Sequence, residues 1–193
     1  MLEEIIEAAR QAGRIMLEAE KMSMDVKEKT GSANFVTQYD MAVQENLRRA
    51  LKKICPEADF LGEEGNDRPE QTELVFIVDP IDGTTNFIHG YRHSAISIAL
   101  AQNGKIEYGV VYNPYTEEVF SAARGRGAYR NGEPIHVSSR PMKEALICFG
   151  TSPYDPSLAE ASFRLAKRLF DMAADIRRRV CGPRPVRHRG RTV

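Results

Sequence analysis

The sequence predicts an α+β domain in which helices cover one face of a largely antiparallel sheet. Two amphipathic segments lie within the first 56 residues, and short apolar runs separated by turn residues follow from residue 73 onward. No internal repeat is evident. The composition agrees with this prediction, because 42% hydrophobic and 28% charged residues are ordinary for a globular protein of 193 residues.

Both predicted helices rest on the spacing of their apolar residues. Steps of three and four place one set of side chains on one side of a helix over residues 2–17: Leu2, Ile5, Ile6, Ala9, Gly13, Met16 and Leu17. A second helix is predicted from the cap residue Thr37 to just before Pro56, which cannot continue it. Its apolar side holds Leu47, Ala50, Leu51 and Ile54.

The strands are predicted from apolar runs bounded by turn residues. Residues 59–62 form a short strand that leads into an acidic pair. Residues 74–78 are continuously apolar, which is typical of a strand buried on both faces, and this strand is predicted to end at Asp79 and Pro80. Further strands are predicted around a hairpin turn at Asn103–Gly104, at 95–100, 106–112 and 118–122.

A second unit is predicted after these hairpins. Residues 145–149 read as a strand, and residues 157–170 read as a helix. The apolar side of this helix holds Leu158, Ala161, Leu165 and Leu169.

The formal net charge of zero hides an asymmetry. Residues 176–193 contain seven arginines and no acid, so the other 175 residues carry 20 basic against 27 acidic residues. An acidic body argues against a nucleic-acid surface over the main domain. The sequence has neither a membrane-spanning apolar stretch nor a signal peptide. Three cysteines without metal-ligand spacing indicate reduced thiols, so we expect a cytoplasmic protein.

The residues with the clearest chemistry are 78–87, Val-Asp-Pro-Ile-Asp-Gly-Thr-Thr-Asn-Phe. Asp79 and Asp82 lie at the end of a predicted buried strand, and Pro80 stiffens the turn between them. Gly83 permits a close backbone approach, and the two threonines after it begin a helix whose free amide groups suit a phosphate. Carboxylate oxygens beside a phosphate suit Mg²⁺.

Two other interpretations of this segment are open. The same residues suit an ordinary turn, since proline is favoured at its second position. An EF-hand loop fits poorly, because Ile81, Thr84 and Gly90 would occupy positions that require other residues. Two further acidic sites, Glu63–Glu64 after a short strand and Asp40 near the start of the second helix, favour a metal cage over a simple turn.

Residues 76–89 closely resemble the first signature of the inositol monophosphatase family. Residues 34–40 and 61–64 also resemble the family, and residues 109–114 and 124–132 look like its hairpin segments. The resemblance covers residues 1 to about 178. It implies the layered αβαβα sandwich of this family.

The resemblance implies a set of metal ligands. Glu63, Asp79 and Asp82 match metal-binding carboxylates, and Ile81 matches a position that binds through its backbone carbonyl. The implied metal is Mg²⁺. Two further residues fall near the site in the family pattern: Lys29 and Glu64.

The resemblance also implies catalytic and phosphate-binding roles. Thr84, paired with Asp40, matches the group that orients and deprotonates a water molecule, and Glu63 joins them in the implied catalytic set. The backbone amides of Gly83, Thr84 and Thr85 match a phosphate cradle. The implied reaction is in-line attack of Mg²⁺-activated water on a phosphate monoester, without a phosphoenzyme.

The last residues depart from the family. Its members continue into a second α/β domain with a Gly-Ser-Ala-Ala-Leu-Asp-Leu segment and a later Trp-Asp motif, and this chain has no tryptophan. If GC-rich codons are chosen for Arg179 and the residues after it, the same bases read from the second base of the first codon encode that Gly-Ser-Ala segment. We therefore expect a frameshift after Arg178, which the nucleotide sequence tests. A basic arm for nucleic acid or acidic lipid is the alternative.

Three regions are thus expected. Residues 1–143 form a complete amino-terminal α+β domain that binds metal and phosphate, and residues 144–178 begin a second, truncated α/β domain. Residues 179–193 are expected to form a basic tail that lies outside the family, is read out of frame and belongs to neither domain. Members of the family form homodimers, which the truncation makes doubtful here.

The expected function is Mg²⁺-dependent hydrolysis of inositol monophosphate or a similar small phosphate ester, weakened or lost through truncation. A related phosphatase for fructose bisphosphate, histidinol phosphate or a nucleotide 3′-phosphate is an alternative. A non-catalytic remnant that binds metal or phosphate and acts through protein contacts is an alternative of another class. The expected partner is a small phosphorylated metabolite, with no nucleic acid and no membrane.

Overall fold

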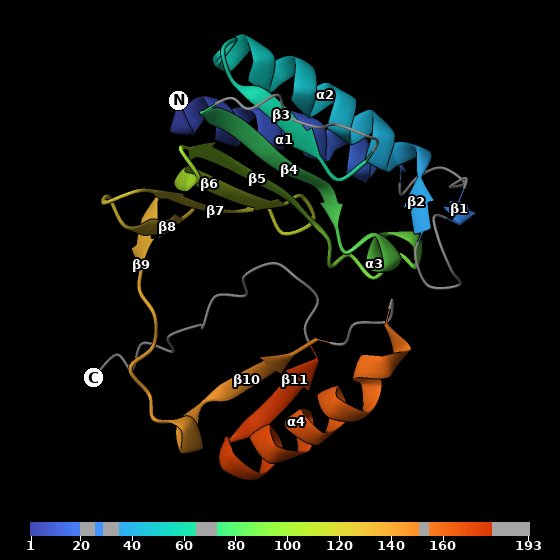
Figure 1. The fold of residues 1–193 in the computed structure, drawn as a ribbon, viewed down its shortest axis with the longest axis vertical. Coiled ribbons are helices and arrows are strands. Elements are labelled where there is room, and N and C mark those ends of the chain that lie inside the picture. Colours follow the sequence, from blue (N-terminus) through green and yellow to red (C-terminus); the bar gives the residue numbers. More distant parts are fainter. Residues whose placement is uncertain (20–25, 29–34, 65–72, 151–154, 179–193) are drawn as a thin grey trace.

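The computed structural model describes residues 1–19, 26–28, 35–64, 73–150 and 155–178 (Figure 1). The tail at 179–193 lies outside the described residues. The elements are α1 (Leu2–Ala19), β1 (Val26–Glu28), β2 (Phe35–Thr37), α2 (Gln38–Ile54), β3 (Asp59–Gly62), β4 (Leu74–Asp82), α3 (Thr84–Ile88), β5 (Ala95–Gln102), β6 (Lys105–Asn113), β7 (Glu118–Ala123), β8 (Ala128–Arg130), β9 (Glu133–Ile135), β10 (Leu146–Phe149), α4 (Ala159–Met172) and β11 (Asp175–Arg178).

The main sheet has seven strands in the order β3-β4-β5-β6-β7-β8-β9. Only β3 and β4 run parallel, and every other pair in this sheet is antiparallel. The hairpin between β5 and β6 turns at Asn103 and Gly104, whose φ angles of 50° and 72° are the positive values that a two-residue hairpin requires. The largely antiparallel sheet is therefore as predicted.

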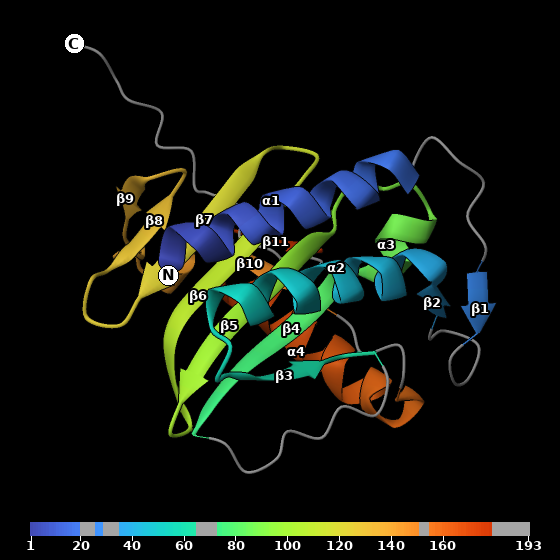
Figure 2. The ribbon, with the colours of Figure 1, turned by 90° about the horizontal axis from the view of Figure 1, so that it is seen from above.

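Helices α1 and α2 lie side by side over one face of this sheet (Figures 1 and 2). Their apolar stripes meet the sheet in a single core, whose largest fully buried side chains include Ile5, Met16, Leu47, Phe76 and Ile98. This arrangement confirms the predicted α+β class. None of the described helices combines the length and the apolar character that crossing a membrane requires.

Strand β4 differs from its prediction in two ways. It continues to Asp82 instead of ending at Asp79 and Pro80. It is also not buried on both faces, because Phe76 is 1% exposed whereas its neighbour Ile77 is 40% exposed. Phe76 faces α1 and α2, and Ile77 points to the opposite face, which these helices do not cover.

Strands β10 and β11 pair in parallel and form a sheet of their own with α4. This unit lies on the side of the main sheet opposite α1 and α2 (Figure 1). The expected apolar side of α4 is poorly covered, since Leu158 is 46% and Leu165 is 51% exposed, and Ala166 is the residue of α4 that is buried. Two strands present too little apolar surface to cover a helix. The boundary between residues 143 and 144 stays a prediction.

Gly13 allows α1 to approach β6 closely, which gives a stability prediction. A Cβ at this position would lie 2.6 Å from Cε1 of Tyr112 and 3.1 Å from Cβ of Pro114. We expect Gly13→Ala to lower the free energy of unfolding by about 1–3 kcal/mol, measured by urea denaturation. Gly109→Ala is the control, because a Cβ there meets no atom within 4 Å. An unchanged midpoint for Gly13→Ala would contradict the predicted clash.

Candidate metal and phosphate site

The predicted acidic residues gather where two parallel strands end. Glu63 follows the last residue of β3, and Asp79 and Asp82 lie near the carboxyl end of β4. The backbone N–H of Glu63 donates to the carbonyl of Val78 over 3.1 Å, which sets Glu63 beside Asp79. Because the two strands are parallel, their carboxyl ends meet at one edge of the sheet.

A bulge in β4 brings the two aspartates together. Asp79 pairs with Ser97 and Asp82 pairs with Ala95, so three steps along β4 match two steps along β5. In a regular strand, residues three apart point to opposite faces. The extra residue turns the end of β4, and the charge of Asp82 acts on the carboxyl group of Asp79.

The carboxyl group of Asp79 has a strongly raised pKa. Burial, the charges of Glu63 and Asp82, a hydrogen bond with Glu63 and the charge of Asp40 raise its pKa to about 8. Its Oδ1 atom is buried and has no hydrogen-bond partner in the described residues. A cation at this oxygen would supply the missing partner and relieve the repulsion among the acids.

Asp40 and Thr84 meet although 44 residues separate them. Asp40 lies in the first turn of α2 and is 1% exposed. Thr84 Oγ1 lies 3.2 Å from Oδ1 of Asp40 and 3.0 Å from the carbonyl oxygen of Ile81, so its hydroxyl hydrogen can be donated to either acceptor. Donation to Asp40 leaves the hydroxyl oxygen of Thr84 able to accept a hydrogen bond from a water molecule.

The bend before α3 depends on Gly83, whose φ of 88° and ψ of 42° lie in the left-handed region. The carbonyl of Gly83 accepts hydrogen bonds from the backbone N–H groups of Asn86 and Phe87 and from Oγ of Ser94, at 2.9, 3.1 and 3.1 Å. The side chain of Thr85 is exposed. The bend is therefore held firmly, and the first amide groups of α3 are those that have no acceptor inside a helix.

The structure brings the predicted residues into one neighbourhood, but it does not close them into a cage. Among the described side chains, no three His, Cys, Asp or Glu residues are arranged to hold one metal ion. The ligand roles of Glu63, Asp79, Ile81 and Asp82 therefore stay a prediction. Lys29 lies outside the described residues.

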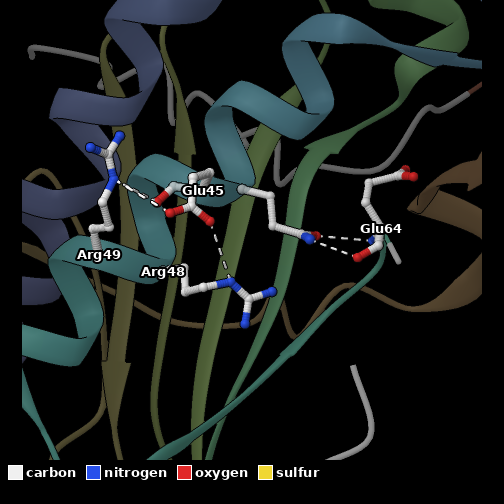
Figure 3. Close-up of polar contacts among 5 residues, drawn as sticks. Glu45, Arg48, Arg49 and Glu64 are labelled. Atoms are coloured by element: carbon white, nitrogen blue, oxygen red, sulfur yellow. Dashed lines mark hydrogen bonds and ion pairs between the residues drawn. The ribbon is translucent and has the colours of Figure 1, made fainter. Parts of the chain in front are cut away.

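Sequence reasoning missed Gln44. This residue of α2 is 5% exposed, and its side-chain amide forms two hydrogen bonds with the backbone of Glu64, which are the dashed lines at the labelled Glu64 in Figure 3. A local signal existed, because Gln44 is a polar residue directly beside Val43 in the helical stripe that continues to Leu47. That pattern indicates a buried polar contact but not its partner.

Comparison with known proteins shows which family this chain belongs to. The chain matches the model of the inositol monophosphatase family over residues 1–184. The chain belongs to the inositol monophosphatase family. Its sequence is 37% identical over 151 residues to the Nus factor SuhB of Pseudomonas aeruginosa, covering 76% of this chain. It is 40% identical over 136 residues to human inositol monophosphatase 1, covering 68% of this chain.

Solved structures of the family share the fold. The structure of the extragenic suppressor protein suhB from Bartonella henselae matches with a TM-score of 0.84 and 36% identity, covering 91% of this chain and 69% of that one. The chain spans 56% of the Pseudomonas aeruginosa protein and 49% of the human protein. The predicted inositol monophosphatase resemblance and fold type are therefore confirmed.

Proposed function

We propose that this chain is a Mg²⁺-dependent phosphomonoesterase whose substrate is inositol monophosphate or a similar small phosphate ester. The observation that carries the proposal is the buried Oδ1 of Asp79, which lies within a cluster of acids and has no hydrogen-bond partner among the described residues. This cluster lies next to the Gly83 bend, where α3 begins. A cation site beside a set of backbone amides suits a phosphate group.

Carboxylate oxygens of Glu63, Asp79 and Asp82 and the carbonyl oxygen of Ile81 would hold the metal. These are hard oxygen donors of the kind that Mg²⁺ prefers. When bound, Mg²⁺ supplies charge neutralisation at the phosphoryl group and makes water more acidic. In support, a solved IMPase/NADP phosphatase complexed with Mg²⁺ and phosphate matches this chain at 25% identity with a TM-score of 0.72.

The residues of the chain have separate tasks in this proposal. The backbone amides of Gly83, Thr84 and Thr85 bind the phosphate oxygens. Asp40 accepts a hydrogen bond from the hydroxyl group of Thr84. The hydroxyl oxygen of Thr84 is then free to accept a hydrogen bond from a water molecule and to orient that water for attack. Because Asp40 is buried on a helix, its carboxylate is held in place as an acceptor for this hydroxyl group.

The identity of the ester is the finer part of the proposal. Inositol monophosphate is preferred because human inositol monophosphatase 1 is among the similar proteins. Fructose bisphosphate, histidinol phosphate and nucleotide 3′-phosphates remain alternatives of the same chemistry. The proposal includes a cytoplasmic enzyme whose partner is a small phosphorylated metabolite.

Release of inorganic phosphate from this panel of esters tests the proposal. We expect release by the full chain that requires Mg²⁺, is abolished by EDTA and is lost in Asp79→Asn. We also expect a lower rate than that of relatives, because the chain spans only about half of their length. Release that persists in EDTA or in Asp79→Asn would overturn the proposed site.

A non-catalytic binding role is the second candidate. One similar protein carries the name of a Nus factor, and large apolar side chains of α4 are exposed, including Phe163 at 62% and Phe170 at 56%. Exposed apolar groups of this size are typical of surfaces that contact other proteins. Uptake of Mg²⁺ without hydrolysis of any ester in the panel would favour this candidate.

A further inference from the structure

The side chain of Gln44 forms hydrogen bonds with the backbone of the turn that follows β3. Its Nε2 donates to the carbonyl oxygen of Glu64 over 2.7 Å, and its Oε1 accepts from the N–H of Glu64 over 3.0 Å (Figure 3). Both ends of this side-chain amide are therefore paired, which offsets the cost of burying it. The two bonds fix the position and the orientation of the Glu64 peptide groups.

Gln44 is the end of a series of contacts between α2 and the segment from Ala58 to Glu64, which contains β3. Arg48, one turn further along α2, places its guanidinium carbon 4.2 Å from the centre of the Phe60 ring. Lys52, another turn along, places Nζ 3.5 Å from the carbonyl oxygen of Ala58. Among the described strands, β3 lies at the edge of the main sheet and pairs with β4 alone. These contacts therefore hold it from its start to the turn at its end.

Gly62 provides the space for the Gln44 amide. A Cβ on Gly62 would lie 2.3 Å from Oε1 and 2.5 Å from Cδ of Gln44. The last residue of β3 thus leaves room for the side chain that bonds to Glu64, two residues further along the chain.

These contacts determine where Glu63 lies. The N–H of Glu63 is bonded to Val78 on β4, and the next residue is held by Gln44 on α2. The side chain of Glu63 is itself exposed, so packing within the core does not orient it. We propose that Gln44 is a positioning residue, which directs the carboxylate of Glu63 toward Asp79 for metal binding. This inference rests on the proposed function.

Calorimetric titration of the full chain with MgCl₂ tests the inference. We expect Gln44→Met, which keeps the length of the side chain but removes both hydrogen bonds, to weaken Mg²⁺ binding by roughly ten- to a hundredfold. Arg48→Met is the matched control, because it removes a contact with β3 that lies farther from Glu63. We expect this control to change Mg²⁺ affinity less than about threefold while its melting temperature falls.

Gly62→Ala tests the same contact if Gln44→Met fails to fold. The added Cβ displaces the end of Gln44 and breaks its two hydrogen bonds, so we expect weaker Mg²⁺ binding together with a lower melting temperature. Wild-type Mg²⁺ affinity in folded Gln44→Met or Gly62→Ala would overturn the positioning role of Gln44 but not the proposed function. Equal weakening by Gln44→Met and Arg48→Met would also overturn the positioning role, since both would then act through stability. Absence of Mg²⁺ uptake by the wild type would overturn the proposed function itself.

Discussion

Asp79→Asn is expected to weaken Mg²⁺ binding by more than roughly a hundredfold. Loss of a residue that only supports a metal ligand weakens binding by up to about a hundredfold, and Asp79 is itself a proposed ligand. The substitution removes a carboxylate ligand whose Oδ1 atom is buried and has no hydrogen-bond partner within the part of the chain that the structure describes. Asparagine has the same shape and can donate the hydrogen bond that Asp79 shares with Glu63. The loss will therefore report the missing charge rather than a collapse of the site.

Calorimetric titration with MgCl₂ measures this effect, and Asp171→Asn is the matched control. Asp171 is an exposed acid of α4 whose carboxylate pairs with Lys167 over 2.9 Å. We expect this control to bind Mg²⁺ as the wild type does. Wild-type affinity in Asp79→Asn would show that the acids at the end of β4 do not form the metal site.

The stability of the metal-free protein is expected to fall as the pH rises from about 4 to about 8 because of Asp79. The pKa of this carboxyl group is about 8 in the folded protein, against an ordinary value of 3.8. Burial comes first among the causes, followed by the charges of Glu63 and Asp82. The folded state thus binds the proton more tightly than the unfolded chain. The resulting stability is complete at low pH and is lost as the pH rises through the folded pKa.

The difference between the wild type and Asp79→Asn isolates this contribution from all other titrating groups. In EDTA, we expect the free energy of unfolding of Asp79→Asn, relative to that of the wild type, to rise by about 1–3 kcal/mol between about pH 5 and about pH 8.5. This range allows for solvent screening of a partly exposed group. Urea denaturation at a series of pH values measures the difference. Adding Mg²⁺ at the higher pH will stabilise the wild type alone. A difference that does not change with pH would contradict the raised pKa.

Local patterns were sufficient to predict most elements of the main domain. The spacing of apolar residues in α1 depends on neighbours three and four positions away, and the turn at Asn103–Gly104 depends on two residues. The length of β4 was not predicted, because its last residues pair with β5 across a bulge that has no signal in the proline-containing segment.

The candidate site was predicted in part. The motif from Asp79 to Thr84 indicated metal and phosphate chemistry through adjacent residues. Asp40 and Glu63 stood out as acids at the ends of predicted elements, but their roles came from a family resemblance. Gln44 was missed altogether. Its partner Glu64 lies 20 residues away, and no pattern within α2 specifies which strand end the amide will reach.

The order of helices and strands, the hairpin turns and the acidic motif follow from the sequence alone, because each depends on residues that are close neighbours along the chain. Three features instead arise from tertiary packing: Asp40 reaches Thr84, a bulge lets Asp82 act on Asp79, and Ile77 is left exposed. Those outcomes depend on which surfaces pack together. Packing brings together residues that are far apart in sequence, and a local sequence pattern does not specify which distant residue will become the partner.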